Sequence, residues 1–112
     1  METISYSDFL KVDIRVWTIL TVDDFPEARK PAYKLTIDFW EELWVKKSSA
    51  QITDLYTKED LIWKQIVAVV NFPQKQIWPF MSECLVTWFS DKNWDIVLIG
   101  PESKVPNGEK LH

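Results

Sequence analysis

Hydrogen-bonding and charged side chains gather between two apolar runs in the second half of the sequence. The runs, over 66–70 and 85–89, are rich in the β-branched and aromatic residues that favour strands. The polar side chains between them are Asn71, Gln74, Lys75, Gln76, Ser82 and Glu83. These groups bind ligands through hydrogen bonds and charge, and loops held by rigid elements often carry them. The alternative is an ordinary surface loop.

Groups suited to covalent or metal chemistry are scarce. His112 is the sole histidine and ends the sequence, so we expect no histidine-based catalytic dyad. Cys84 is the sole cysteine and begins an apolar run, where a buried structural thiol is favoured over a nucleophile. These two residues make no metal-ligand cluster, and the sequence has no glycine-rich phosphate-binding motif. We therefore expect a binding protein rather than an enzyme, with no cofactor and no metal.

The charge is acidic overall but unevenly distributed. A net charge of −4 argues against a protein that binds polyanions over its whole surface. Residues 29–75 nevertheless contain eight Lys or Arg and only six Asp or Glu. A modest basic face would bind nucleic acid through few phosphate contacts and in a salt-sensitive way. The alternative is that these lysines only make the protein surface soluble.

The length of 112 residues fits one domain with a small core. No apolar run approaches the roughly 20 residues that span a membrane. Residues 1–5 lack the basic and apolar regions of a signal peptide. The single cysteine allows no intrachain disulfide and fits a reducing compartment, so we expect a cytoplasmic protein without membrane insertion.

The hydrophobic pattern predicts a mainly β domain. Short helices are predicted over 5–10 and 57–62, each near a Ser or Thr that can cap it. Six segments have the alternation or the apolar runs of strands: 13–22, 33–39, 46–53, 66–70, 84–89 and 95–99. In the first of them, Ile14, Val16, Leu20 and Val22 are expected to face the core. A helix between the third and fourth strands favours an OB-fold, a five-stranded Greek-key barrel with short helices and terminal extensions.

Tryptophan occurs seven times and glycine twice, whereas average usage predicts roughly eight glycines. Trp94 lies in a predicted hairpin turn and Trp63 at a helix end, both of which favour glycine. The remaining tryptophans are Trp17, Trp40, Trp44, Trp78 and Trp88. Our hypothesis is that tryptophan stands in place of glycine at several of these positions, through an altered or mis-recorded sequence. It predicts positive φ at several of them, above all at Trp94. The alternative is a hydrophobic ligand surface made of seven aromatic side chains.

Five short motifs carry a specific resemblance that covers essentially the whole chain. They are Asp13-Ile14-Arg15-Val16, Phe25-Pro26-Glu27-Ala28-Arg29-Lys30-Pro31-Ala32, Lys47-Ser48-Ser49-Ala50-Gln51-Ile52-Thr53, Val69-Val70-Asn71-Phe72-Pro73 and Val105-Pro106-Asn107-Gly108. In this order they resemble the CsaA family, which belongs to the tRNA-binding-domain group of OB-folds, alongside C-terminal modules of some methionyl-tRNA synthetases. The sequence departs from the family at the tryptophans, where the family mostly has glycine. It also departs at Gln74, where a second proline is usual.

The resemblance implies a cytoplasmic homodimer with one tRNA-binding-type domain over 1–112, in which 1–12 and about 100–112 contribute to the dimer interface. It also implies tRNA binding and a role as a chaperone for Sec-dependent protein export. The positions that would line the RNA-facing side are Arg15, Lys47, Ser48, Ser49, Asn71, Lys75, Ser82 and Glu83. Arg and Lys suit phosphates, Ser and Asn suit sugars and base edges, and Glu83 suits a base or an amide.

For the export role, an extended peptide would need an apolar groove. Candidates for its lining are Phe39, Phe72, Ile77 and Phe80, and the alternative for each is core packing. The leading hypothesis is a non-catalytic tRNA-binding protein that also serves as an export chaperone. The alternative is a chaperone that binds unfolded precursor proteins and the Sec translocation motor, with weak or absent RNA binding.

Overall fold

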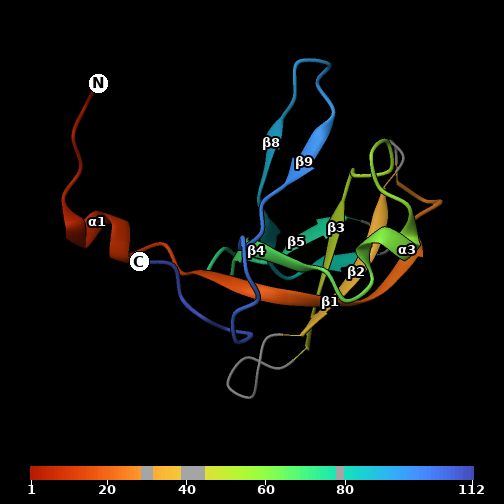
Figure 1. Cartoon of the computed structure of the whole chain (residues 1–112), viewed down its shortest axis with the longest axis horizontal. Coiled ribbons are helices and arrows are strands. Elements are labelled where there is room, and N and C mark those ends of the chain that lie inside the picture. Colours follow the sequence, from red (N-terminus) through yellow and green to blue (C-terminus); the bar gives the residue numbers. More distant parts are fainter. Residues whose placement is uncertain (29–31, 39–44, 78–79) are drawn as a thin grey trace.

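Strand β1 is the longest element and the centre of the sheet (Figure 1). The computed structural model describes residues 1–28, 32–38, 45–77 and 80–112. Its strands are β1 (Ile14–Asp24), β2 (Tyr33–Asp38), β3 (Val45–Ala50), β4 (Gln65–Val69), β5 (Lys75–Ile77), β6 (Phe80–Ser82), β7 (Leu85–Val86), β8 (Trp88–Ser90) and β9 (Ile96–Leu98). Its helices are α1 (Tyr6–Leu10) and α3 (Lys58–Leu61). All six segments predicted as strands therefore contain strands, and both predicted helices are confirmed.

The main sheet has five antiparallel strands in the order β3-β2-β1-β4-β7. The first half of β1 pairs with β4, as in Val16 opposite Val67, and its second half pairs with β2, as in Val22 opposite Leu35. The two outer strands approach each other, because the Ser48 hydroxyl of β3 donates to the carbonyl of Cys84, just before β7, at 3.0 Å. The sheet thus curls into a nearly closed barrel, with α3 between the third and fourth strands of the sequence. The predicted OB-type architecture is confirmed.

The core lies inside this barrel and includes Ile37, Leu61 and Ile66, each fully buried. The predicted orientation of β1 was wrong at its centre, where Trp17 and Ile19 are the buried residues. A register shift between Ile19 and Thr21 then returns Val22 to the interior. Because a bulge adds one residue to a strand, it reverses the inward alternation from that point on.

Both short helices begin at the predicted capping residues. In α3 the Asp60 amide donates to the Thr57 hydroxyl at 3.2 Å, and the Thr57 amide donates to the Asp60 carboxylate at 3.0 Å. This reciprocal pair satisfies two amides that the helix itself cannot. The hydrogen bond from the Thr57 amide, followed by that from its hydroxyl, lowers the pKa of Asp60 from its ordinary value. Ser5 and Asp8 form the same capping box in α1.

Two hairpins extend from the barrel: β5 pairs with β6, and β8 pairs with β9. The second is a ribbon that projects beyond the sheet, and its strands are joined by the turn around Trp94 (Figure 1). Within the predicted strand 84–89, only β7 joins the main sheet, and β8 leaves it for this ribbon. The Cys84 side chain is buried, as predicted.

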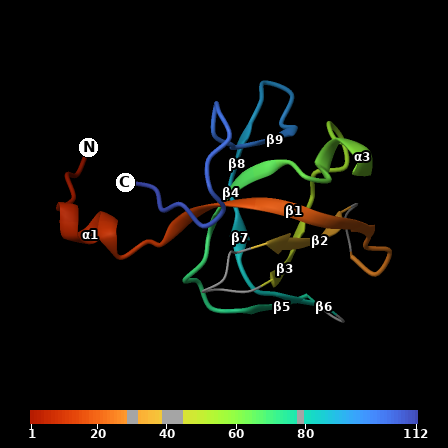
Figure 2. The same cartoon turned by 60° about the horizontal axis from the view of Figure 1, so that its bottom comes forward.

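The chain ends lie together at one side of the barrel (Figure 2). The C-terminal segment pairs with β1, since the Gly108 amide donates to Val16 at 2.8 Å and the Leu111 amide donates to Ile14 at 2.8 Å. Helix α1 buries none of its residues and lies away from the barrel in both views (Figures 1 and 2). In the described ranges, no helix is long and apolar enough to cross a membrane.

Two of the tryptophans have left-handed backbone conformations. Trp94 has φ of 67° and Trp63 has φ of 69°, and within the described residues these are the non-glycine positions with positive φ. The prediction for Trp94 is therefore confirmed. Trp17 is fully buried and Trp88 lies in β8, both without positive φ. The predictions for Trp40, Trp44 and Trp78 concern positions outside the described residues.

Candidate functional site

Four of the predicted site residues meet where β3 faces the segment between β6 and β7. We call this group, with Gln74, the seam: Lys47, Ser48, Gln74, Ser82 and Glu83. The Glu83 amide donates to the Lys47 carbonyl at 2.8 Å, and the Lys47 amide donates to the Glu83 carboxylate at 3.0 Å. Glu83 thus binds both the amide and the carbonyl of Lys47, as a residue of a neighbouring strand would. This pairing closes the barrel at this point.

The Glu83 carboxylate also accepts a hydrogen bond of 3.3 Å from the Gln74 amide group. It therefore accepts hydrogen bonds from two amide groups, and it ties the loop before β5 to the barrel. Gln74 itself was not predicted as a functional residue. Its chemical type and its place in a polar loop were visible in the sequence, but its partner nine positions away was not.

The two serines of the seam differ in exposure. Ser48 is only 1% exposed, and its hydroxyl is used inside the barrel wall by the Cys84 carbonyl. Ser82 is half-buried; its hydroxyl lies 3.4 Å from that of Ser48 and donates to the same carbonyl at 3.3 Å. Lys47 is exposed. A ligand at the seam would therefore meet Lys47 and Ser82, while Ser48 supports the wall behind them.

Other predicted site residues lie next to the seam in the backbone register. Lys75 of β5 pairs with Ser82 of β6, and Ser49 of β3 pairs with Lys34 of β2. The side chains of Ser49 and Lys75 are outside the described part of the structure. Of the predicted peptide groove, the side chain of Phe72 is described, and it is half exposed. The side chains of Ile77 and Phe80, and the whole of Phe39, are outside that part.

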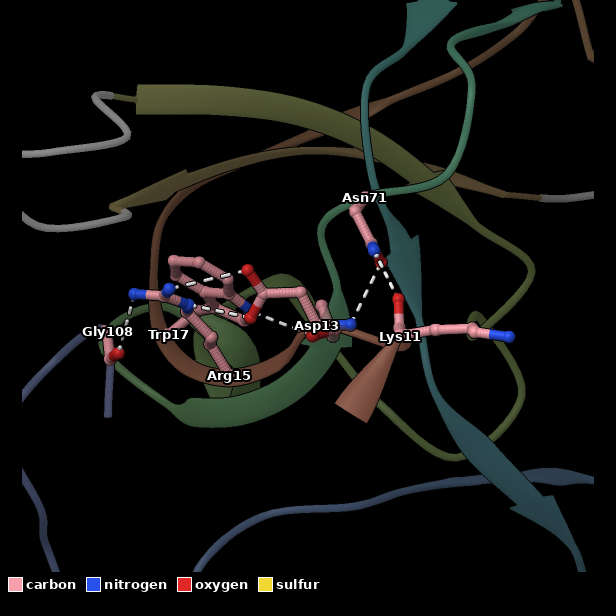
Figure 3. A network of polar contacts seen from close by, with 7 residues as sticks. Lys11, Asp13, Arg15, Trp17, Asn71 and Gly108 are labelled. Carbon is pink, nitrogen blue, oxygen red and sulfur yellow. Dashed lines mark hydrogen bonds and ion pairs between the residues drawn. The ribbon is translucent and has the colours of Figure 1, made fainter. Parts of the chain in front are cut away.

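Arg15 and Asn71 belong to a second group, the junction, made of Lys11, Asp13, Arg15, Asn71 and Gly108 (Figure 3). Arg15 forms an ion pair with Asp13, with its Nε 2.8 Å from one carboxylate oxygen, and it donates to the Gly108 carbonyl at 3.4 Å. Asn71 donates to the Lys11 carbonyl at 2.6 Å and accepts from the Asp13 amide at 2.9 Å. The junction therefore binds three separate segments of the chain to one another.

Sequence analysis missed the role of Asp13 in this arrangement. Residues two apart in a strand share a face, so the spacing of Asp13 and Arg15 was a usable signal for an ion pair. This pairing partly neutralises the guanidinium toward phosphate. In the described part of the structure, the hydrogen bonds given for the junction and those given for the seam involve different residues.

Comparison with known proteins places this barrel in a family. Residues 14–110 match the family described as "Putative tRNA binding domain". Methionine–tRNA ligase of Methanococcus aeolicus is 32% identical over 111 residues, which are 99% of this chain and 16% of the ligase. The chain thus spans only about a sixth of that relative's length.

Solved structures of chain-length relatives are more similar. The chaperone CsaA of Bacillus anthracis str. Ames is 48% identical with a TM-score of 0.90, covering 99% of this chain and all of its own. The CsaA chaperone protein of Picrophilus torridus is 50% identical, also with a TM-score of 0.90, over 98% of this chain and all of its own. The family that the sequence motifs resemble and the observed barrel agree with these matches. The chain belongs to the tRNA-binding-domain family and, within it, to the CsaA proteins.

Proposed function

We propose that this protein is a non-catalytic RNA-binding module that holds structured tRNA on the barrel face around the seam. The observation that carries the proposal is the match of residues 14–110 to the tRNA-binding-domain family. The seam supports it, because it presents an exposed lysine beside a half-buried serine on a rigid barrel wall. A rigid wall lets such groups bind without being ordered first.

In this proposal the predicted residues divide into two kinds. Lys47 and Lys75 contact phosphates, and Ser49 and Ser82 contact sugars or base edges, in the manner typical of folded RNA. Glu83 and Ser48 hold the wall and orient Lys47. Arg15 contributes from the junction, where its guanidinium is already paired with Asp13.

We expect Lys47→Gln to weaken tRNA binding several-fold at low salt. It should also make the plot of log affinity against log salt less steep, by the amount that about one lost phosphate contact predicts. The matched control is Lys92→Gln, which removes an exposed lysine from the turn between β8 and β9. Electrophoretic mobility shifts with tRNA at two salt concentrations measure both effects. Absence of a shift for the wild-type protein at low salt, or a shift that is insensitive to salt, would contradict the RNA-binding proposal.

A second candidate function is that of a chaperone for precursor proteins bound for export. It is favoured by the description of both similar solved structures as chaperones. Half-exposed Phe72 would contribute to an apolar groove with Phe39, Ile77 and Phe80. Unfolded precursors and the Sec translocation motor would be its partners. If the protein fails to suppress aggregation of a denatured client protein, the chaperone candidate is wrong. If the Phe72→Ser variant suppresses aggregation as well as the wild-type protein does, the proposed groove is wrong.

We further propose a homodimer whose interface includes residues 1–12 and about 100–112. Support comes from the apolar residues exposed at the chain ends: Ile4, Tyr6, Leu10, Val12 and Leu111. A five-residue helix is marginal in water without a packing partner, and a second copy would provide one. A monomer mass in sedimentation analysis would exclude this arrangement. The proposed compartment is the cytoplasm, which suits a chain with a single cysteine and therefore no intrachain disulfide.

A further inference from the structure

Asn71 takes the place of a strand residue at the end of the β1–β4 pairing. The last register pair is Ile14 opposite Val69, and the Val70 amide then donates to the Asp13 carbonyl at 2.9 Å. Beyond it, the side-chain amide of Asn71 continues the ladder by accepting from the Asp13 amide at 2.9 Å and donating to the Lys11 carbonyl at 2.6 Å (Figure 3). Both polar atoms of this amide therefore bind the main chain of the N-terminal arm, residues 1–13.

The contacts described between the arm and this barrel are these two hydrogen bonds, the one from the Val70 amide and the ion pair of Asp13 with Arg15. Helix α1 buries none of its residues, and the arm lies away from the barrel (Figure 2). Packing of the helix on this barrel therefore does not hold the arm in place. Segments with few buried apolar contacts and exposed hydrogen bonds are those that open most readily. Loss of the Asn71 contacts would therefore weaken the attachment of the arm around residues 11–13.

On its other side, Asn71 begins the loop that leads to the seam. The chain runs from Asn71 through Gln74, which contacts Glu83, into β5 and its pairing with Ser82. Asn71 is thus the point at which the arm meets residues 72–77, which carry Lys75 of the proposed RNA-binding face and end in strand β5. We call them loop 72–77. A ligand that orders the loop would favour the geometry in which the Asn71 amide also holds the arm.

We propose that Asn71 is a tether that couples the order of the N-terminal arm to RNA binding at loop 72–77, instead of a residue that reads a base. The ligand side of the coupling rests on the proposed RNA-binding function. Because such a coupling is reciprocal, an ordered arm also favours RNA binding. Asn71 is therefore a positioning residue whose effect reaches RNA through the loop.

Hydrogen exchange measured by mass spectrometry on the full chain, with and without tRNA at low salt, tests the tether. In the wild-type protein we expect tRNA to slow exchange in the arm, around residues 10–13, as well as in the loop. In Asn71→Ala we expect arm exchange to rise roughly thirtyfold, the factor that two ordinary hydrogen bonds supply. Added tRNA should then no longer protect the arm. Asn71→Asp keeps the acceptor for the Asp13 amide but loses the donor to Lys11, so its exchange rates should be intermediate.

Other outcomes overturn the proposal. If Asn71→Ala weakens tRNA binding while arm exchange stays at the wild-type rate, Asn71 contacts RNA directly and is no tether. If tRNA binds the wild-type protein without protecting the arm, the coupling is wrong although the proposed function stands. If the wild-type protein binds no tRNA in a mobility shift, the proposed function itself fails. The exchange rates of Asn71→Ala without tRNA then still decide whether the arm is tethered.

Discussion

Replacing Leu61 by alanine is expected to lower the free energy of unfolding by about 2–5 kcal/mol. Leu61 is fully buried, belongs to the core cluster and is the buried residue of α3. A four-residue helix has little stability of its own. The leucine side chain therefore both fills the barrel and holds α3 against it, and its truncation would leave a cavity that the surrounding strands cannot close.

Urea unfolding of the variant measures this loss as a lower midpoint with an unchanged slope. The neighbouring substitution Ile62→Ala is a matched control, because Ile62 is 39% exposed. It should cost well under half as much, since less apolar area leaves water on folding. An equal decrease in the free energy of unfolding for the two variants would mean that Leu61 is not the residue through which α3 packs on the core.

Most strands could be predicted from the sequence because each leaves a local pattern, but the short strands β5 and β6 and the orientation of β1 could not. Alternation predicts which face is buried only while the register is unbroken. In β1 the irregularity between Ile19 and Thr21 breaks it, and Trp17 and Ile19 occupy the interior. Nothing in the local composition marks a bulge there. The pairing with β2 and β4 on either side, which depends on distant segments, determines it.

The same reasoning explains the outcome at the candidate site. Residue types between 71 and 83 indicated a polar, hydrogen-bonding region, but not the β5–β6 hairpin that lies in it. However, Asn71 finds its partners 58 and 60 positions earlier in the chain, and Glu83 finds Lys47 36 positions earlier. A single sequence does not show which polar groups are used internally. It therefore cannot separate the side chains that are exposed on the surface, such as Lys47, from those that hold the barrel together.

Replacing Trp63 and Trp94 by glycine is expected to raise the free energy of unfolding, by about 1 kcal/mol at each site. Both have positive φ, which costs a residue with a side chain roughly 1–2 kcal/mol and glycine almost nothing. They are 70% and 84% exposed, so truncation sacrifices little buried area. Part of the gain is offset because glycine loses more freedom on folding. The sites are distinct in the fold, one after α3 and one in the β8–β9 turn, so the two gains should add.

Trp88→Gly is the control, because Trp88 lies in β8 without positive φ, and glycine weakens a strand. Trp88→Gly should lower the free energy of unfolding, whereas the other two substitutions raise it. A higher stability for all three variants would mean that positive φ is not the cause.

The contrast also bears on how tryptophan came to stand at positions that suit glycine. The codon UGA is read as tryptophan in some genetic codes and as glycine in others, so one difference in reading would produce the whole set. Intact mass of the protein from its own cells tests this directly: a mass that requires tryptophan at all seven positions would show that the strained turns at 63 and 94 are native and are stabilised by the rest of the barrel.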